Sequence, residues 1–142
     1  MLDRIAWELT SDSGSEAERV IDLALSTHND RVAPGATGLP LNCFARLDSS
    51  SIVGGVVART WGANCEVLQL YVAPSHRRRG IATQLVSRIE AEARVRRCSL
   101  VYLETFSFQC PEFYKAQGYV VALELGGFPN RVRKLIMSKT LG

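Results

Sequence analysis

The sequence lacks long apolar runs, a secretory signal and clustered metal ligands. No stretch of its 142 residues approaches the roughly 20 apolar residues that a membrane-spanning helix needs. The N-terminus has neither the basic region nor the apolar region of a secretory signal. These absences predict a cytoplasmic protein that does not cross a membrane.

The cysteines and histidines are dispersed along the chain. No two cysteines have the two-residue separation that is typical of zinc sites, and His28 and His76 stand in no ligand pattern. We therefore expect no bound metal. In a cytoplasmic protein we also expect the thiols to be reduced, at Cys43, Cys65, Cys98 and Cys110.

Charge and length limit the function further. The chain has 17 basic and 14 acidic residues, and its net charge of +3 is small for a protein with a broad nucleic-acid-binding surface. Nucleic acid is therefore not favoured as a partner. Hydrophobic residues make up 46% of the chain, as in ordinary globular proteins. The length fits a single domain over residues 1–142.

Apolar periodicity predicts an alternation of strands and helices. The first strand is predicted at residues 4–9, where apolar residues occur at every second position. Capping boxes at Ser13 and Ser15 predict a helix that ends near residues 28–30. The later strands are predicted at residues 43–47, 52–60, 65–72, 99–106, 119–125 and 133–139, and the later helices at 80–95 and 111–117.

The predicted helix at residues 80–95 has the clearest pattern. Its apolar stripe comprises Ile81, Leu85, Val86, Ile89 and Ala93. Its polar residues are expected to face away from the core, at Gln84, Arg88, Glu90, Glu92 and Arg94. The order of all elements predicts a mixed α/β fold of the α+β type, with a largely antiparallel central sheet of about six to seven strands flanked by helices.

A basic turn lies between the predicted strand at residues 65–72 and the following helix. It contains three consecutive arginines and then Gly80. The first amides of a helix lack intrahelical partners and the helix dipole adds positive potential, so the turn is suited to bind phosphate groups. An exposed basic turn before an ordinary helix is an equally good interpretation of this loop alone. The chain has neither a P-loop nor a Rossmann fingerprint.

Two segments resemble one known family. Arg77-Arg78-Arg79-Gly80-Ile81-Ala82 fits the Q/R-x-x-G-x-G/A motif of the GCN5-related N-acetyltransferases (the GNAT superfamily). Phe113-Tyr114-Lys115-Ala116-Gln117-Gly118-Tyr119 is similar to the family's "fYek-GF" segment. The resemblance extends over about residues 16–140, with the elements in the same order.

The resemblance implies that acetyl-CoA is the co-substrate. In the family the motif holds the pyrophosphate, the preceding strand pairs with the pantetheine arm, and the thioester lies in a cleft where this strand and the next splay apart. Ser107 stands where many members carry an asparagine that bonds the cofactor. The residues that this resemblance assigns to cofactor binding are Leu70, Tyr71, Val72, Arg77, Arg78, Arg79, Gly80, Ile81, Ala82 and Ser107.

Acetyl transfer to an amine requires a base, because an amine with a pKa of about 10.4 is almost wholly protonated at pH 7. Glu66 lies eleven residues before Arg77, at the position of the general-base glutamate in the histone-acetyltransferase branch of the family. A surface glutamate on a half-exposed strand is the alternative interpretation. Glu104 on the neighbouring strand and His28 are competing candidates.

The reaction also needs an acid, because the departing CoA thiolate must be protonated. A tyrosine with a pKa of about 10 can supply this proton if it is held against the sulfur. Tyr114 has the position of this tyrosine in the family, and a core aromatic residue is the alternative interpretation. Cys110 replaces the usual alanine, but no histidine or aspartate is placed to activate it, so a covalent acetyl-enzyme is not favoured.

We therefore predict an N-acetyltransferase that transfers acetyl directly from acetyl-CoA to a primary amine of a small molecule or a protein. One alternative is a toxin-type acetyltransferase that acts on aminoacyl-tRNA, which would need a broad basic face. Another is a non-catalytic acyl-CoA-binding module. Dimers are frequent in the family, so a homodimer is a further expectation.

Overall fold

The computed structural model describes residues 4–48 and 50–142. The chain divides into an N-terminal unit that ends at Ala36 and a larger unit, Thr37–Gly142. None of the helices in the described residues is both long enough and apolar enough to cross a membrane.

The N-terminal unit contains helix α1 (Glu16–Val32). Its capping box confirms one of the two predicted start signals. The Ser15 hydroxyl accepts a hydrogen bond from the Glu18 amide at 3.1 Å, and the Glu18 carboxylate accepts one from the Ser15 amide at 3.1 Å. The helix continues to Val32, beyond the predicted end near residues 28–30, and Arg31 in its last turn complements the helix dipole.

The strand predicted at residues 4–9 is wrong, because residues 4–10 have no regular secondary structure. Ile5, Trp7 and Leu9 do alternate as a strand requires. Alternation specifies which side chains share a face, but it does not provide a neighbouring strand to receive the backbone hydrogen bonds. The sheet therefore has six strands, the lower of the two numbers expected.

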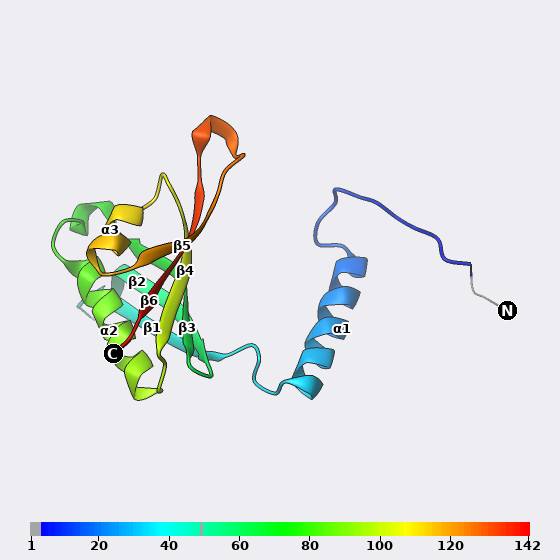
Figure 1. The fold of residues 1–142 in the computed structure, drawn as a ribbon, viewed down its shortest axis with the longest axis horizontal. Coiled ribbons are helices and arrows are strands. Elements are labelled where there is room, and N and C mark those ends of the chain that lie inside the picture. The colour runs from blue at the N-terminus through cyan, green and yellow to red at the C-terminus, as the bar shows by residue number, and fades with distance from the viewer. Residues whose placement is uncertain (1–3, 49) are drawn as a thin grey trace. The chain divides into compact units, whose positions relative to one another are not determined.

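The larger unit forms a six-stranded mixed sheet in the order β1-β2-β3-β4-β6-β5 (Figure 1). Its elements are β1 (Leu39–Leu47), β2 (Ser51–Trp61), β3 (Asn64–Val72), η1 (Pro74–His76), α2 (Ile81–Val95), β4 (Leu100–Phe106), α3 (Pro111–Ala116), β5 (Val120–Leu125), η2 (Pro129–Arg131) and β6 (Lys134–Thr140). Only β3 and β4 pair in parallel, and the other four pairings are antiparallel. This arrangement confirms the predicted mixed, largely antiparallel fold.

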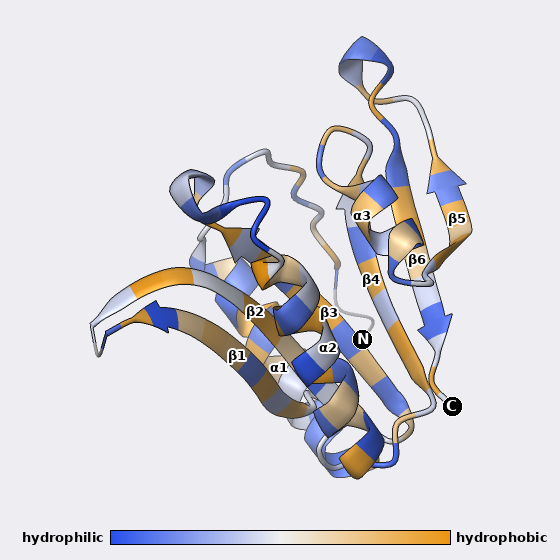
Figure 2. Cartoon of the chain, turned by 90° about the vertical axis from the view of Figure 1, so that its left-hand side faces the viewer, coloured by the Kyte–Doolittle hydropathy of each residue, from blue (hydrophilic) through white to orange (hydrophobic). Residues whose placement is uncertain are grey.

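Helix α2 lies against one face of the sheet, where it contacts β1, β2 and β3 (Figure 2). The predicted apolar stripe is the buried face of the helix, and Ile81 at its start is partly buried. The stripe packs against buried strand residues in one continuous core. Each fully buried aliphatic side chain in such a core contributes roughly 1.5–3 kcal/mol. The strand residues with least exposure are Val56, Cys65, Val101, Leu103 and Met137.

Strand β3 contains a bulge near its middle. The register with β2 shifts by one residue there, which leaves Leu68 as an additional residue on β3. Cys65 and Val67 are buried before the bulge, whereas Leu70 and Val72 contact the core after it. The bulge therefore changes which side chains the second half of β3 directs toward α2.

Candidate functional site

Strands β3 and β4 are paired over only part of their length. Parallel pairing joins residues 64–67 to residues 100–103, and beyond these positions the strands diverge (Figure 2). The second half of β3 and the end of β4 therefore leave the backbone groups that would face each other unpaired. Backbone amides and carbonyls in such an opening are available to a ligand. The predicted splay between these two strands is confirmed.

A cavity of about 630 Å³ occupies this opening. Its volume lies within the range of small-molecule binding sites. Its walls come from β3, from the loop and first turn of α2, from the end of β4, and from the segment up to α3. Eight of the predicted site residues line it: Leu70, Tyr71, Val72, Arg77, Arg78, Ile81, Ala82 and Tyr114.

The loop that leads into α2 has an unusual backbone. Arg78 has a φ of 61° and Gly80 has a φ of 77°, both in the left-handed region. Such a conformation in an arginine is strained, and strained residues concentrate at functional sites. Gly80 is the N-cap of α2, and no side chain caps the helix, so the first amides of α2 are open to an anionic ligand.

The three arginines of the loop do not all line the same cavity. The Arg77 Nε donates to the Val72 carbonyl at 2.9 Å, and its guanidinium lies 5.8 Å from the ring centroid of Tyr71. Arg77 and Arg78 line the cavity between β3 and β4. Arg79 instead lines a second cavity of about 500 Å³ between β1 and α2. The sequence motif therefore supplies two guanidinium groups to the first cavity.

Tyr114, the predicted acid, is a buried residue of α3 whose side chain lines the cavity. Its ring packs edge-on against Phe113 and Tyr119, with centroid distances of 5.3 and 5.6 Å. Burial, together with the neighbouring Cys110, raises the pKa of Tyr114 to about 12. Among the described residues no hydrogen bond engages its hydroxyl. Tyr114 is thus a protonated donor at neutral pH, with its proton free for a ligand.

A buried polar cluster of Tyr119, Glu90 and Lys139 lies next to Tyr114. The Tyr119 hydroxyl donates to a Glu90 oxygen at 3.4 Å, and the Lys139 ammonium lies 3.0 and 2.8 Å from the two Glu90 oxygens. Glu90 is only 5% exposed, and burial, with the carboxylate beside it, raises the pKa of Tyr119 above its usual range. The hydrogen bond to Glu90 fixes the position of the Tyr119 ring, against which the Tyr114 ring packs.

The prediction that Glu90 faces away from the core is wrong. The helix places it beside Ile89, and Lys139 of β6 neutralises its charge there, which makes burial of the carboxylate tolerable. Its helical spacing alone does not reveal this partner. The signal in the sequence is Tyr119, which stands where the similar family segment has phenylalanine and brings a hydroxyl that needs an acceptor.

The two carboxylates considered as bases have different surroundings. Glu66 is bound by Arg59, with nitrogen–oxygen distances of 2.9 and 2.8 Å, and it is not part of the cavity wall. Glu104 lines the cavity and pairs with the Lys134 ammonium at 3.2 Å. His28 belongs to the N-terminal unit. Of the two carboxylates, Glu104 is the one that lines the cavity.

Ser107 is engaged in the backbone beside β4. Its hydroxyl accepts from the Arg133 amide at 2.9 Å, and its own amide donates to the Arg133 carbonyl at 2.8 Å. The following residues reach the cavity instead, at Phe108, Gln109 and Cys110. Sequence reasoning did not assign Gln109 because its approach depends on the turn after β4, which has no motif of its own.

Metal ligands do not gather in this region. Across residues 4–48 and 50–142, no group of three or more histidine, cysteine, aspartate or glutamate side chains could hold a metal ion. The cavity is lined largely by apolar residues, and its ionisable side chains include those of Arg77, Arg78, His76, Glu104 and Tyr114, which suit binding of anions and transfer of protons.

Comparison with known proteins identifies close similarity to acetyltransferases. Acetyltransferase Atu2258 of Agrobacterium fabrum is 30% identical over 118 residues, which cover 83% of this chain and 86% of that protein. Blasticidin-S acetyltransferase of Streptomyces morookaense is 28% identical over 130 residues, which cover 82% of this chain and 96% of that protein.

Solved structures agree with these relatives. A crystal structure of a candidate acetyltransferase from Agrobacterium tumefaciens superposes with a TM-score of 0.84 at 27% identity, and the match covers 96% of this chain and all of that one. An acetyltransferase from Bacillus cereus gives a TM-score of 0.76 at 26% identity, with 94% and 98% covered. The family model described as "Acetyltransferase (GNAT) family" matches residues 5–119. The chain therefore belongs to the GNAT acetyltransferase family.

Proposed function

We propose that the protein is an acetyl-CoA-dependent N-acetyltransferase that transfers the acetyl group directly to a primary amine. The observation that carries this proposal is the cavity between the diverging β3 and β4, which joins the uncapped start of α2 to the buried hydroxyl of Tyr114. A protein from Bacillus anthracis solved with acetyl coenzyme A has the same fold, with a TM-score of 0.64 at 16% identity.

The chain's own groups fit the parts of acetyl-CoA in order. The amides of Ile81 and Ala82 and the guanidinium of Arg78 suit the pyrophosphate, since all three residues lie in the loop or the first turn of α2 and line the cavity. Arg79, whose side chain lines the other cavity, would contribute through its backbone. The edge of β3 at residues 70–72 is not paired with β4 and offers backbone groups to the pantetheine arm, except for the Val72 carbonyl, which accepts from Arg77.

Two proton transfers accompany the acetyl transfer that acetyl-CoA supplies. A carboxylate accepts the proton that the amine must lose, and Tyr114 donates a proton to the leaving sulfur. Glu104 can contact an amine in the cavity directly. Glu66, which the family resemblance favours, would need a bridging water, because Arg59 holds its carboxylate outside the cavity wall.

Small-molecule amines are the favoured acceptors. One relative is named blasticidin-S acetyltransferase. A nourseothricin acetyltransferase shares the fold with a TM-score of 0.63 at 24% identity. We therefore propose a panel of primary amines as the direct test of function, with release of the CoA thiol as the readout. Binding of CoA without acetylation of any amine would instead identify a non-catalytic acyl-CoA-binding module.

Paired amide substitutions distinguish the two carboxylates in this assay. We expect Glu104→Gln to lower kcat/KM at pH 7 by about 100-fold, because a positioned base contributes roughly that factor or more. The loss should shrink as the pH approaches the pKa of the amine. We expect Glu66→Gln to change kcat/KM by less than about fivefold, since it removes a water-mediated contact to the amine and an ion pair with Arg59 outside the cavity wall.

The control for both variants is Glu112→Gln, which neutralises an exposed carboxylate of α3 that pairs with Lys115. It should leave kcat/KM unchanged. If Glu66→Gln shows the 100-fold loss and Glu104→Gln does not, the base is Glu66 and the geometric argument for Glu104 fails.

A further inference from the structure

Three phenylalanines form a small aromatic platform at one end of β4. The rings of Phe106 and Phe108 stack with centroids 5.3 Å apart and an interplanar angle of 8°. Phe128, from the connection between β5 and β6, meets Phe106 edge-on at 5.7 Å. Phe106, Phe108 and Phe128 are called the phenylalanine platform below.

The platform borders the cavity between β3 and β4. Phe108 lines the cavity and is 68% exposed, although phenylalanine is a residue that normally contributes to a core. One face of its ring is covered by Phe106, so the rest of the ring is available to another flat group. An exposed aromatic ring beside a cavity is a typical recognition element for a ring-bearing ligand.

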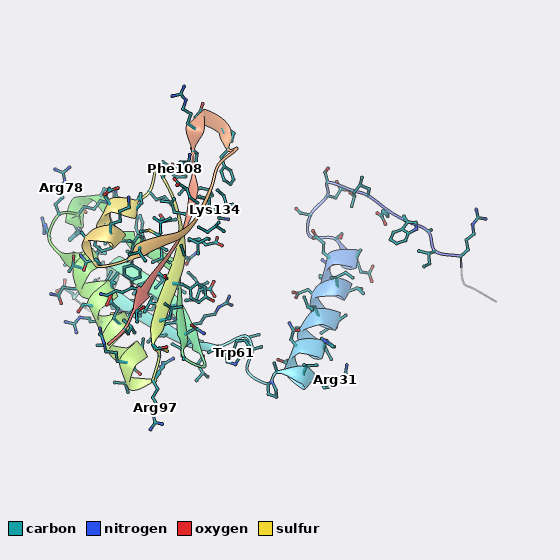
Figure 3. All side chains as sticks on the ribbon, viewed as in Figure 1. Arg31, Trp61, Arg78, Arg97, Phe108 and Lys134 are labelled. Atoms are coloured by element: carbon teal, nitrogen blue, oxygen red, sulfur yellow. The ribbon has the colours of Figure 1, made fainter. Side chains whose placement is uncertain are left out.

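An ammonium group is already bound at this platform. Lys134 and Phe108 are labelled in Figure 3. The Lys134 ammonium lies 5.6 Å from the centroid of Phe106 and 3.2 Å from the Glu104 carboxylate. These are the two kinds of contact that recognise cationic amines, namely a carboxylate and the face of an aromatic ring. The Glu104 side chain is 59% exposed in this pair, so a second ammonium can approach it from the cavity.

The ring and the carboxylate lie on the same wall of the cavity. Glu104 and Phe108 both line it, and both belong to the end of β4 or the turn that follows. A ligand that places a flat ring on Phe108 can therefore bring an amine on a short linker toward Glu104. Arg77 and Arg78, in the loop before α2, also line this cavity and give it basic groups separate from Glu104.

We propose that the acceptor is a cationic primary amine carried on an aromatic or heteroaromatic ring, with the ring stacked on Phe108 and the ammonium beside Glu104. This substrate class rests on the proposed function, because it assigns the platform to the acceptor of that reaction. The phenylalanine platform selects the ring, and Glu104 selects the positive charge over a negative one.

The test is calorimetric titration of the full chain with three ligands of similar size, in the presence of CoA and again without it. The ligands are 2-phenylethylamine, 2-cyclohexylethylamine and 3-phenylpropionate. We expect 2-phenylethylamine to bind about tenfold more tightly than either of the others. The cyclohexyl amine lacks a flat ring, and the propionate carries the wrong charge for Glu104.

Three variants test which side chains cause the preference for 2-phenylethylamine. Phe108→Leu keeps an apolar side chain and should abolish the preference for phenyl over cyclohexyl. Phe44→Leu, at an exposed phenylalanine of β1 outside this cavity, should leave that preference intact. Glu104→Gln should reduce the discrimination between amine and carboxylate.

Equal affinities for the three ligands, no binding of any, or a phenyl preference that survives Phe108→Leu would overturn the proposal. These outcomes do not depend on turnover. If the aromatic amine binds as expected but acetyl-CoA neither binds nor reacts, then the proposed enzymatic function fails while the ligand site stands.

Discussion

Replacement of Tyr114 by phenylalanine should lower kcat by about 100-fold or more while the Kd for CoA stays nearly constant. The variant keeps the ring that packs against Phe113 and Tyr119 and removes only the hydroxyl of a residue that lines the cavity. General acids contribute roughly 10²–10⁴-fold to the rate. Steady-state kinetics at saturating acetyl-CoA and CoA titration measure the two quantities separately.

The raised pKa of Tyr114 gives a second expected result, which concerns the pH dependence of the rate. Its pKa is raised to about 12 by burial, so the hydroxyl stays protonated through the neutral and moderately alkaline range. The rate profile of the natural protein should therefore show no loss from Tyr114 ionisation below about pH 11. A basic limb near pH 10 that is absent in Tyr114→Phe would contradict the assigned environment.

Tyr71→Phe is the matched control for Tyr114→Phe. Tyr71 also lines the cavity, but it is an exposed residue of β3, and its ring contact with Arg77 does not need the hydroxyl. We expect less than about a threefold change in kcat. Comparable losses in the two variants, or no loss in Tyr114→Phe, would remove Tyr114 from the role of acid.

The largest effect on stability is expected from Lys139→Met. This change removes the only cation that pairs with Glu90 in the described residues, and it leaves a nearly buried carboxylate uncompensated. Breaking a buried ion pair from one side is worth about 3–5 kcal/mol. Lys139 itself is partly exposed, so we expect a loss of about 3 kcal/mol in the free energy of unfolding and a Tm lower by roughly 10 °C.

A compensating variant separates the buried charge from simple loss of packing. Glu90→Leu combined with Lys139→Met and Tyr119→Phe removes the charge, its partner and the hydroxyl that needs an acceptor. This triple variant should recover at least half of the lost stability, because apolar replacements of buried pairs are often neutral or better. Urea unfolding of the natural protein and both variants measures the difference. A triple variant less stable than Lys139→Met would contradict this account of the cluster.

Local patterns in the sequence were sufficient for most of the larger unit. The glycine, proline and apolar periodicity around α2 placed that helix and its buried stripe within a residue of the observed boundaries. Local patterns do not show which strands pair with each other. The alternation at residues 4–9 predicted a strand that has no partner, since a strand exists only with a neighbour to receive its hydrogen bonds.

In the candidate site too, local sequence signals were informative and contacts between distant residues were not predicted. The resemblance to the family assigned the arginine–glycine motif and the tyrosine segment to one site, and Arg77, Arg78, Ile81, Ala82 and Tyr114 from these two segments line the same cavity. The burial of Glu90 depends on Lys139, which lies 49 residues away in the chain, so its own helix cannot reveal it. The platform of Phe106, Phe108 and Phe128 likewise needs two separate connections to meet.

The central claim is that acetyl-CoA binds at the start of α2, and thermal unfolding with and without acetyl-CoA tests it most directly. A ligand at one hundred times its Kd stabilises the native state by about 2.7 kcal/mol, which corresponds to a shift of several degrees in Tm. We expect this shift in the natural protein and its loss in Gly80→Glu, which places a carboxylate at the anion site.

Gly62→Glu is the control for the strain and the charge of that substitution. Both glycines have a positive φ and open space for a side chain. Gly80 lies between Arg78 and Ile81, which line the cavity, whereas Gly62 lies in the turn between β2 and β3, whose residues do not line it. This variant should keep the full shift. Absence of a shift in the natural protein at millimolar acetyl-CoA, or an equal shift in Gly80→Glu, would contradict binding of the co-substrate at this loop.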